Sequence, residues 1–343
     1  MFICFILMAN ETEDHETQYC FPAVNSSCIK TKRSTLESNV MYVSFSLLSV
    51  WTVFLNLLVI ISISHFKKLH TPTNLLILSL AVADMLVGLI VMPVEAVKLI
   101  ETCWYFGDIF CGLFLIIMGL LLSMSFNNLI LIAIDRFIAV CYPLQYERKI
   151  TTSKTLISIC LCWFFSTVYY TAVFAVNKYI ITSNRTDGCY GECTFVMGFV
   201  WGVVDQIVGF FLPFIVLITF YLRIFCVAQQ HVKVINSLIK SGKHLTEGSI
   251  KRKSESKAAL TLGIIVLIHL LCWSGYIFYL AVSADAPSVV NSMNWTVYSS
   301  SGLNPLVYAL FYPWFRRALK HILTLKIFSP ASSLVNILAD HHS

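Results

Sequence analysis

Charged residues are scarce in this chain. Asp, Glu, Lys and Arg make up 12% of its 343 residues, about half the share that is usual in soluble domains. Hydrophobic residues reach 57%, and the mean hydropathy is +0.77. The composition therefore excludes a water-soluble domain and predicts a polytopic membrane protein whose surface is covered by membrane lipid.

The chain has long runs of apolar residues with few charged ones. Each is long enough to cross a hydrocarbon core about 30 Å thick, which takes roughly 20 helical residues. Because every backbone group must be paired inside the segment, a single apolar run in lipid has to be a helix. We predict an all-α membrane protein, a bundle of seven transmembrane helices near residues 42–65, 74–97, 109–134, 155–177, 198–226, 258–283 and 293–312.

The segment after the seventh span has a different pattern. In PWFRRALKHILTLKIF, apolar and basic residues alternate at helical spacing, which predicts a short amphipathic eighth helix on the inner leaflet. Residues 1–41 are then an extracellular segment, residues 42–312 the bundle, and residues 313–343 the cytoplasmic helix and tail.

Basic residues lie mainly on one side of this topology. With the N-terminus outside, 18 of the 24 Lys and Arg residues fall on the inner side, as the positive-inside rule requires. The net charge of +6 thus indicates a cytoplasmic basic surface and not nucleic-acid binding. The expected location is the plasma membrane, with glycosylation sequons outside at Asn10, Asn25 and Asn184.

Asp205 is an acid in the fifth apolar run, with no Lys or Arg at comparable depth. Burying its charge costs roughly 2.5–3.5 kcal/mol on insertion scales. A cation that arrives from outside would offset this cost, so Asp205 is a candidate anchor for a positively charged ligand. The alternative is a protonated or water-bridged acid that only packs helices.

The order of short motifs resembles that of the rhodopsin-like G-protein-coupled receptors from residue 43 to residue 325. One motif falls in each predicted helix: NLLV at Asn56, LAVAD at Asp84, AIDRFIAV with Asp135 and Arg136, Trp163, Pro213 with Tyr221, CWSGY at Trp273, and NPLVY from Asn304 to Tyr308.

Within that family the chain is most similar to the trace amine-associated receptors, through HFKKLHTPTN, CWYFG, FYPWFRRA and CYGEC. The resemblance implies an olfactory amine receptor that signals through a stimulatory G protein and raises cyclic AMP. Met118, however, stands where aminergic receptors usually carry the amine-binding aspartate. Some members of the group use an acid on the fifth span, so the resemblance assigns the counter-ion role to Asp205.

The resemblance also names the rest of the ligand pocket. An aromatic cage that attracts alkylammonium ions and an apolar wall are expected from Trp273, Tyr276, Tyr298, Met118 and Leu122. Gln206 either makes polar contacts there or faces a neighbouring helix. The rival function is a receptor of the same family for a non-amine ligand, with Asp205 merely structural.

Two further polar groups match family positions. Asp84, Asn56, Ser125 and Asn304 match a cluster that holds either sodium, as a brake on activation, or only structural water. No other cofactor is expected.

At the inner face, Asp135, Arg136, Tyr221 and Tyr308 match the G-protein switch. Glu255, eighteen residues before Trp273, either pairs with Arg136 or is a solvated loop charge. His269, one turn before Trp273, is either a hydrogen-bonded neutral core residue or a pH-sensitive group.

The resemblance implies a Cys111–Cys193 disulfide. By the same resemblance, Cys28 is the favoured disulfide partner of Cys189. Cys20 and Cys103 are rival partners that spacing alone does not exclude. An enzyme is not expected, because the His and Asp residues of the spans are too scattered to form a nucleophile–base pair or a metal site. An opsin is disfavoured because the seventh span has no lysine for retinal.

Overall fold

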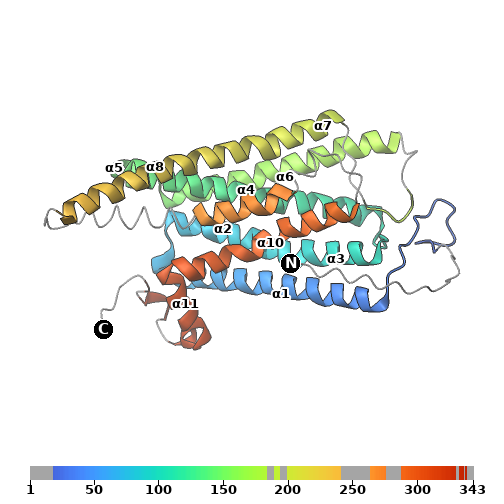
Figure 1. Ribbon diagram of the computed structural model, residues 1–343, viewed down its shortest axis with the longest axis horizontal. Helices are drawn as coiled ribbons and strands as arrows, with labels where there is room; N and C mark the ends of the chain where they lie inside the picture. The colour runs from blue at the N-terminus through green and yellow to red at the C-terminus, as the bar shows by residue number, and fades with distance from the viewer. Residues whose placement is uncertain are drawn as a thin grey trace.

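The computed structural model describes residues 18–183, 189–193, 199–240, 263–275, 287–329, 332–335 and 337. These form a bundle of long helices that lie side by side along the longest axis of the molecule (Figure 1). The prediction of an all-α seven-helix membrane protein is confirmed. Among the described residues, five helical spans are long and apolar enough to cross a membrane, and the shorter apolar helix Gly263–Gly275 adds to them.

The first two spans begin at hydrogen-bonded caps. Helix α1 (Thr35–His65) starts after Ser34, whose hydroxyl accepts from the Glu37 N–H at 3.1 Å. Helix α2 (Pro72–Leu86) starts after Thr71 with proline at its first position, where the missing N–H costs nothing. A π-helical turn, η2 (Val87–Val91), leads into α3 (Met92–Glu101) and completes the second span.

The middle of the bundle is built on the third span, α4 (Gly107–Cys141). A short helix α5 (Pro143–Lys149) follows it at the inner face, and α6 (Thr152–Ser183) is the fourth span. The Trp163 indole of α6 donates to the Ser79 hydroxyl of α2 at 3.3 Å. This contact ties the fourth span to the second.

The fifth span changes its helical pitch at the acid. It consists of α7 (Phe199–Val204), a π-helical turn η3 (Asp205–Phe211) and α8 (Leu212–Lys240). Helix Gly263–Gly275 belongs to the sixth span, α10 (Pro287–Phe311) is the seventh, and α11 (Pro313–Leu323) turns away at the C-terminal end (Figure 1). Trp314, Phe315 and Ala318 of α11 are buried, as the amphipathic pattern predicts.

Packing between spans depends on small residues at close contacts. The Ser49 hydroxyl of α1 donates to the Gly88 carbonyl of η2 at 2.6 Å. A Cβ atom on Gly88 would lie 3.0 Å from the Thr52 methyl group, so a larger residue would push the first two spans apart.

Residues 18–34 lie at the end of the bundle opposite α11 (Figure 1). Three disulfides among the described residues hold this face: Cys111–Cys193, Cys28–Cys189 and Cys20–Cys103. The first two are the pairs named from the sequence. The expectation of only two bridges is wrong, because Cys20 and Cys103, treated as rivals for Cys189, bond to each other.

Candidate functional site

A cavity of about 340 Å³ lies between the third, fourth, fifth, sixth and seventh spans. It brings together six of the seven residues expected in the ligand pocket; Tyr276 lies outside the described residues. Its lining consists of Met118, Gly119, Leu122, Ser123, Phe126, Tyr170, Asp205, Gln206, Gly209, Trp273, Asn294, Val297 and Tyr298. Asp205 is the one charged group among these described lining residues, so the cavity offers a negative site within largely apolar walls.

Asp205 has a partner that was not foreseen from the sequence. The Tyr169 hydroxyl of α6 donates a 2.7 Å hydrogen bond to Asp205 Oδ1. The sequence indicated only that Asp205 lacks a Lys or Arg at its depth, and it did not reveal this neutral donor. A phenol donor stabilises the carboxylate but leaves its negative charge in place, because the donor itself is neutral.

Aromatic rings form part of the cavity wall. The Trp273 ring stacks on His269 with centroids 5.7 Å apart, and Phe126 lies 5.4 Å from the same imidazole. The Tyr298 hydroxyl, from the seventh span, points at the Met118 sulfur at 3.6 Å. Tyr298 is buried, so its ring is available to face a ligand and not solvent.

The cavity lining includes the polar residues Gln206, Ser123 and Asn294, and only the first was expected there from the sequence. Gln206 was named from the sequence; its Oε1 is buried and has no hydrogen-bond partner among the described residues. Ser123 and Asn294 were not named. Ser123 lies next to Leu122 and near Met118 on α4, a position that could have revealed it, whereas nothing in the sequence shows which way Asn294 points.

The Asp84 cluster forms in the interior of the bundle. Ser125 Oγ donates to Asp84 Oδ1 at 2.6 Å, and Asn304 Nδ2 donates to Oδ2 at 2.7 Å. The Asn56 amide donates instead to the carbonyls of Thr52 and Ser301, at 2.9 and 3.0 Å. Asp84 is fully buried, and these hydrogen bonds, with a further one from the Ser301 side chain, offset part of its desolvation.

The inner face contains a buried ion pair between neighbours in the chain. Arg136 contacts Asp135 at 2.6 Å, and Asp135 also accepts from Thr73 at 2.7 Å and from the Tyr146 hydroxyl at 2.8 Å. Burial and the Asp135 charge raise the pKa of Tyr146, on α5, to about 12, so its phenol stays protonated and donates. Thr73 and Tyr146 were not foreseen from the sequence.

The two tyrosines of the expected switch have buried hydroxyl groups. The hydroxyls of Tyr221 and Tyr308 have no hydrogen-bond partner within the described part of the chain. The Tyr308 ring contacts Tyr312 and Phe315 edge-on. Glu255, the expected partner of Arg136, lies outside the described residues.

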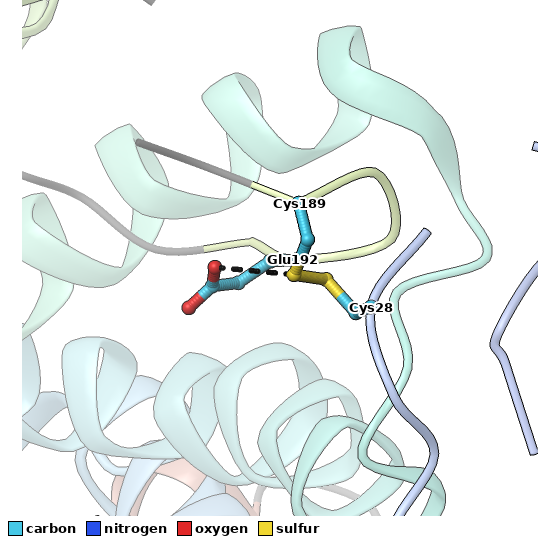
Figure 2. A group of neighbouring side chains, drawn as sticks. All are labelled: Cys28, Cys189 and Glu192. Carbon is cyan, nitrogen blue, oxygen red and sulfur yellow. Dashed lines mark hydrogen bonds between the residues drawn. A yellow bond between two sulfur atoms is a disulfide. The ribbon is translucent and has the colours of Figure 1, made fainter. Parts of the chain in front are cut away.

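The outer loop carries a second acid beside a disulfide. Figure 2 shows Cys28 bonded to Cys189, with Glu192 Oε2 3.9 Å from the Cys189 sulfur. A metal would need thiolates, and the disulfide consumes both sulfurs, so these three side chains are not a ligand set. Of the sequons, Asn25 is exposed, while Asn10 and Asn184 lie outside the described residues.

The protein is a seven-helix bundle with a cavity among its spans and a buried Asp135–Arg136 pair. This combination is typical of one class of membrane receptors. The family described as "7 transmembrane receptor (rhodopsin family)" matches residues 55–308. Receptors of this kind are not enzymes, and they are multi-pass proteins of the plasma membrane.

Comparison with curated proteins narrows the class. Trace amine-associated receptor 13c of Danio rerio is 40% identical and covers 94% of this chain and 96% of its own length. Trace amine-associated receptor 4 of Mus musculus is 37% identical, covering 95% and 97%, and receptor 6 of Pan troglodytes is 38% identical, covering 94% and 96%. The chain belongs to the trace amine-associated receptors of the rhodopsin family.

Proposed function

We propose that this receptor senses amines, with the ligand ammonium paired to Asp205. The observation that carries the proposal is the single charged group among the described lining of the cavity, a carboxylate surrounded by apolar and aromatic walls. An ammonium ion offsets the burial of that charge. The faces of Trp273 and Tyr298 would add cation–π attraction of about 0.5–2 kcal/mol, and the names of the related receptors agree with such a ligand.

The direct test is an amine panel in a cyclic-AMP reporter assay that compares the native receptor with Asp205→Asn. Asparagine keeps the shape and removes the charge. We expect the response to fall by at least about 100-fold in potency, since a charge-assisted hydrogen bond and an ion pair are both lost.

The control for this test is Glu192→Gln, which removes the exposed acid of the outer loop. Both variants must reach the cell surface in native amounts. Unchanged amine potency in Asp205→Asn would overturn the amine assignment and favour a receptor for a non-amine ligand.

Signal transfer is proposed to follow the family pattern. Agonist binding would shift the population towards a state in which the inner cleft opens, with Asp135, Arg136, Glu255, Tyr221 and Tyr308 rearranging to admit a stimulatory heterotrimeric G protein. Cells that lack the stimulatory α-subunit should give no cyclic-AMP response; a retained response would contradict this coupling.

The polar cluster around Asp84 fits a sodium ion. Besides the carboxylate and the Ser125 hydroxyl, the buried Oδ1 atom of Asn56 has no hydrogen-bond partner among the described residues, and oxygen ligands suit a hard cation. Replacing sodium by potassium chloride in membrane preparations should raise agonist potency in the native receptor and leave Asp84→Asn unchanged. Equal effects in both would exclude this site.

We also propose that the N-terminus is extracellular and that Asn10, Asn25 and Asn184 are the glycosylation sites. The excess of Lys and Arg in the opposite loops supports this orientation. An N-terminal epitope tag should be stained on intact cells, and staining only after permeabilisation would reverse the topology.

A further inference from the structure

The Tyr169–Asp205 hydrogen bond links two spans through residues that are 36 positions apart in sequence. Tyr169 lies on α6, and Asp205 is the first residue of the π-helical turn η3. Such turns are rare and occur frequently at functional sites. The bond therefore fixes the acid at the point where the fifth span changes its pitch.

Tyr169 is itself held in place by its neighbours. Its ring meets Tyr170 edge-on, with centroids 5.2 Å apart and an interplanar angle of 88°. Tyr170 lines the cavity and lies so close to Gly119 that a Cβ atom there would be 2.5 Å from the ring. Gly119, Tyr170, Tyr169 and Asp205 thus form a continuous set of contacts from the third span to the fifth.

The phenol has a chemical advantage over a basic side chain at this position. A lysine or arginine would cancel the charge of Asp205 and compete with a ligand ammonium, whereas a neutral O–H donor bonds to the carboxylate without cancelling its charge. The donor occupies Oδ1, so Oδ2 is the oxygen left for a ligand. Gly209 leaves room beside Asp205 Oδ1, because a Cβ atom at this position would lie 3.3 Å from that oxygen.

We propose that Tyr169 is a positioning residue of the amine site, which holds Asp205 Oδ1 so that Oδ2 receives the ligand ammonium. This inference rests on the proposed function, since it gives Tyr169 a role only if Asp205 is the counter-ion. The amine site then depends on two residues, Tyr169 of the fourth span and Asp205 of the fifth. The fourth span sets the direction in which the carboxylate points.

The test variant is Tyr169→Phe, which removes only the hydroxyl group. Amine concentrations for half-maximal cyclic-AMP response should rise about tenfold, the order expected for loss of one hydrogen bond to a charged group. The maximal response and the basal cyclic-AMP level should stay native, because the signalling parts are untouched. Thr167→Val is the matched control: its hydroxyl, two residues earlier, donates to the Trp163 carbonyl of its own helix at 2.8 Å.

A second measurement separates positioning from simple packing. In purified receptor without ligand, Tyr169→Phe should lower the melting temperature in the native background and have a smaller effect in the Asp205→Leu background, where the acceptor is gone. Equal losses in both backgrounds, or unchanged amine potency in Tyr169→Phe, would overturn the proposal. If Asp205→Asn responds like the native receptor, the amine assignment itself fails; loss in Asp205→Asn with no change in Tyr169→Phe refutes only the positioning role.

Discussion

Asp205, Asp84 and Asp135 lie inside the bundle and differ in their partners. Asp205 and Asp84 accept hydrogen bonds from neutral groups, a phenol in one case and a hydroxyl and an amide in the other. Asp135 instead contacts the guanidinium of Arg136. A neutral donor leaves the negative charge available to an incoming cation, whereas an ion pair cancels it. This difference supports the proposed ligand site at Asp205 and the proposed switch role of Asp135.

Gly119 provides a residue-scale prediction for the cavity. In Gly119→Ala the added methyl group would lie 2.5 Å from Tyr170, so the ring must move, and overpacking of this kind costs about 1–3 kcal/mol. We expect amine potency in the cyclic-AMP assay to fall several-fold, because Tyr170 lines the cavity and supports Tyr169.

Gly112→Ala is the matched control for that prediction. Its added methyl group would lie 2.4 Å from Phe174, between the same two helices but outside the cavity lining. Both variants should lose melting temperature, and only Gly119→Ala should lose potency. An equal shift of potency in both would mean that general loosening of the bundle explains the effect.

At the scale of the elements, residues 18–34 link neighbouring parts of one end of the bundle. Besides their two disulfides, Lys30 contacts Glu101 at the end of α3 at 3.2 Å, and the hydrogen bond to Glu101 raises the pKa of Lys30. The Thr31 N–H donates to Thr102 Oγ1 at 3.0 Å. The segment therefore joins the second span to the loop before the fifth.

The Cys20–Cys103 bridge gives a prediction at this scale. Removing a native disulfide typically costs about 2–5 kcal/mol, so Cys20→Ser and Cys103→Ser should each lower the melting temperature of the purified receptor. The double variant should be no less stable than either single variant, because only one bond is lost. Additive losses, or free alkylation of both thiols in the native receptor, would disprove this pairing.

Across the whole molecule, ring packing extends from the ligand cavity into the core of the bundle. Trp273, in the cavity lining, contacts the rings of His269 and Phe126. The His269 ring nitrogens are buried and have no hydrogen-bond partner among the described residues. One interpretation made from the sequence was a hydrogen-bonded core residue; the burial of His269 agrees with it, but the hydrogen bonds are not found among the described residues.

The expected contact between Arg136 and Glu255 gives a prediction for the whole molecule. If Glu255 pairs with Arg136 in the resting receptor, Glu255→Gln removes one of the contacts that keep the cleft closed. Basal cyclic AMP should then rise about threefold, which a population shift of roughly 0.7 kcal/mol provides. Glu247→Gln, an acid of the same connection, serves as the control and should leave basal cyclic AMP unchanged; equal basal levels in the two variants would show that Glu255 is only a solvated charge.

Sequence reasoning succeeded where the signal is local. Helical spans follow from apolar length, and the membership of the receptor family follows from motifs such as AIDRFIAV and NPLVY. Met118, Leu122, Asp205, Gln206, Trp273 and Tyr298 do line one cavity, while their role in ligand binding stays a prediction.

The residues that sequence reasoning missed depend on contacts between distant segments. The apolar residues of α6 show no preferred face, so nothing in its pattern indicates that Tyr169 points at the fifth span. Cys20 and Cys103 are 83 residues apart, and Thr73 and Tyr146 reach Asp135 from two different elements.

The amino-acid sequence by itself determined that this protein is a bundle of membrane-spanning helices, because the length of an apolar run and the need to pair its backbone are properties of each segment alone. Its short motifs, which are local too, indicated the receptor family. The tertiary structure alone decided which side chain meets Asp205 and which cysteine meets Cys103. The first choice depends on how α6 and the fifth span are rotated about their axes, which packing against neighbouring helices sets. The second depends on how the segment before α1 lies over the connection between α3 and α4.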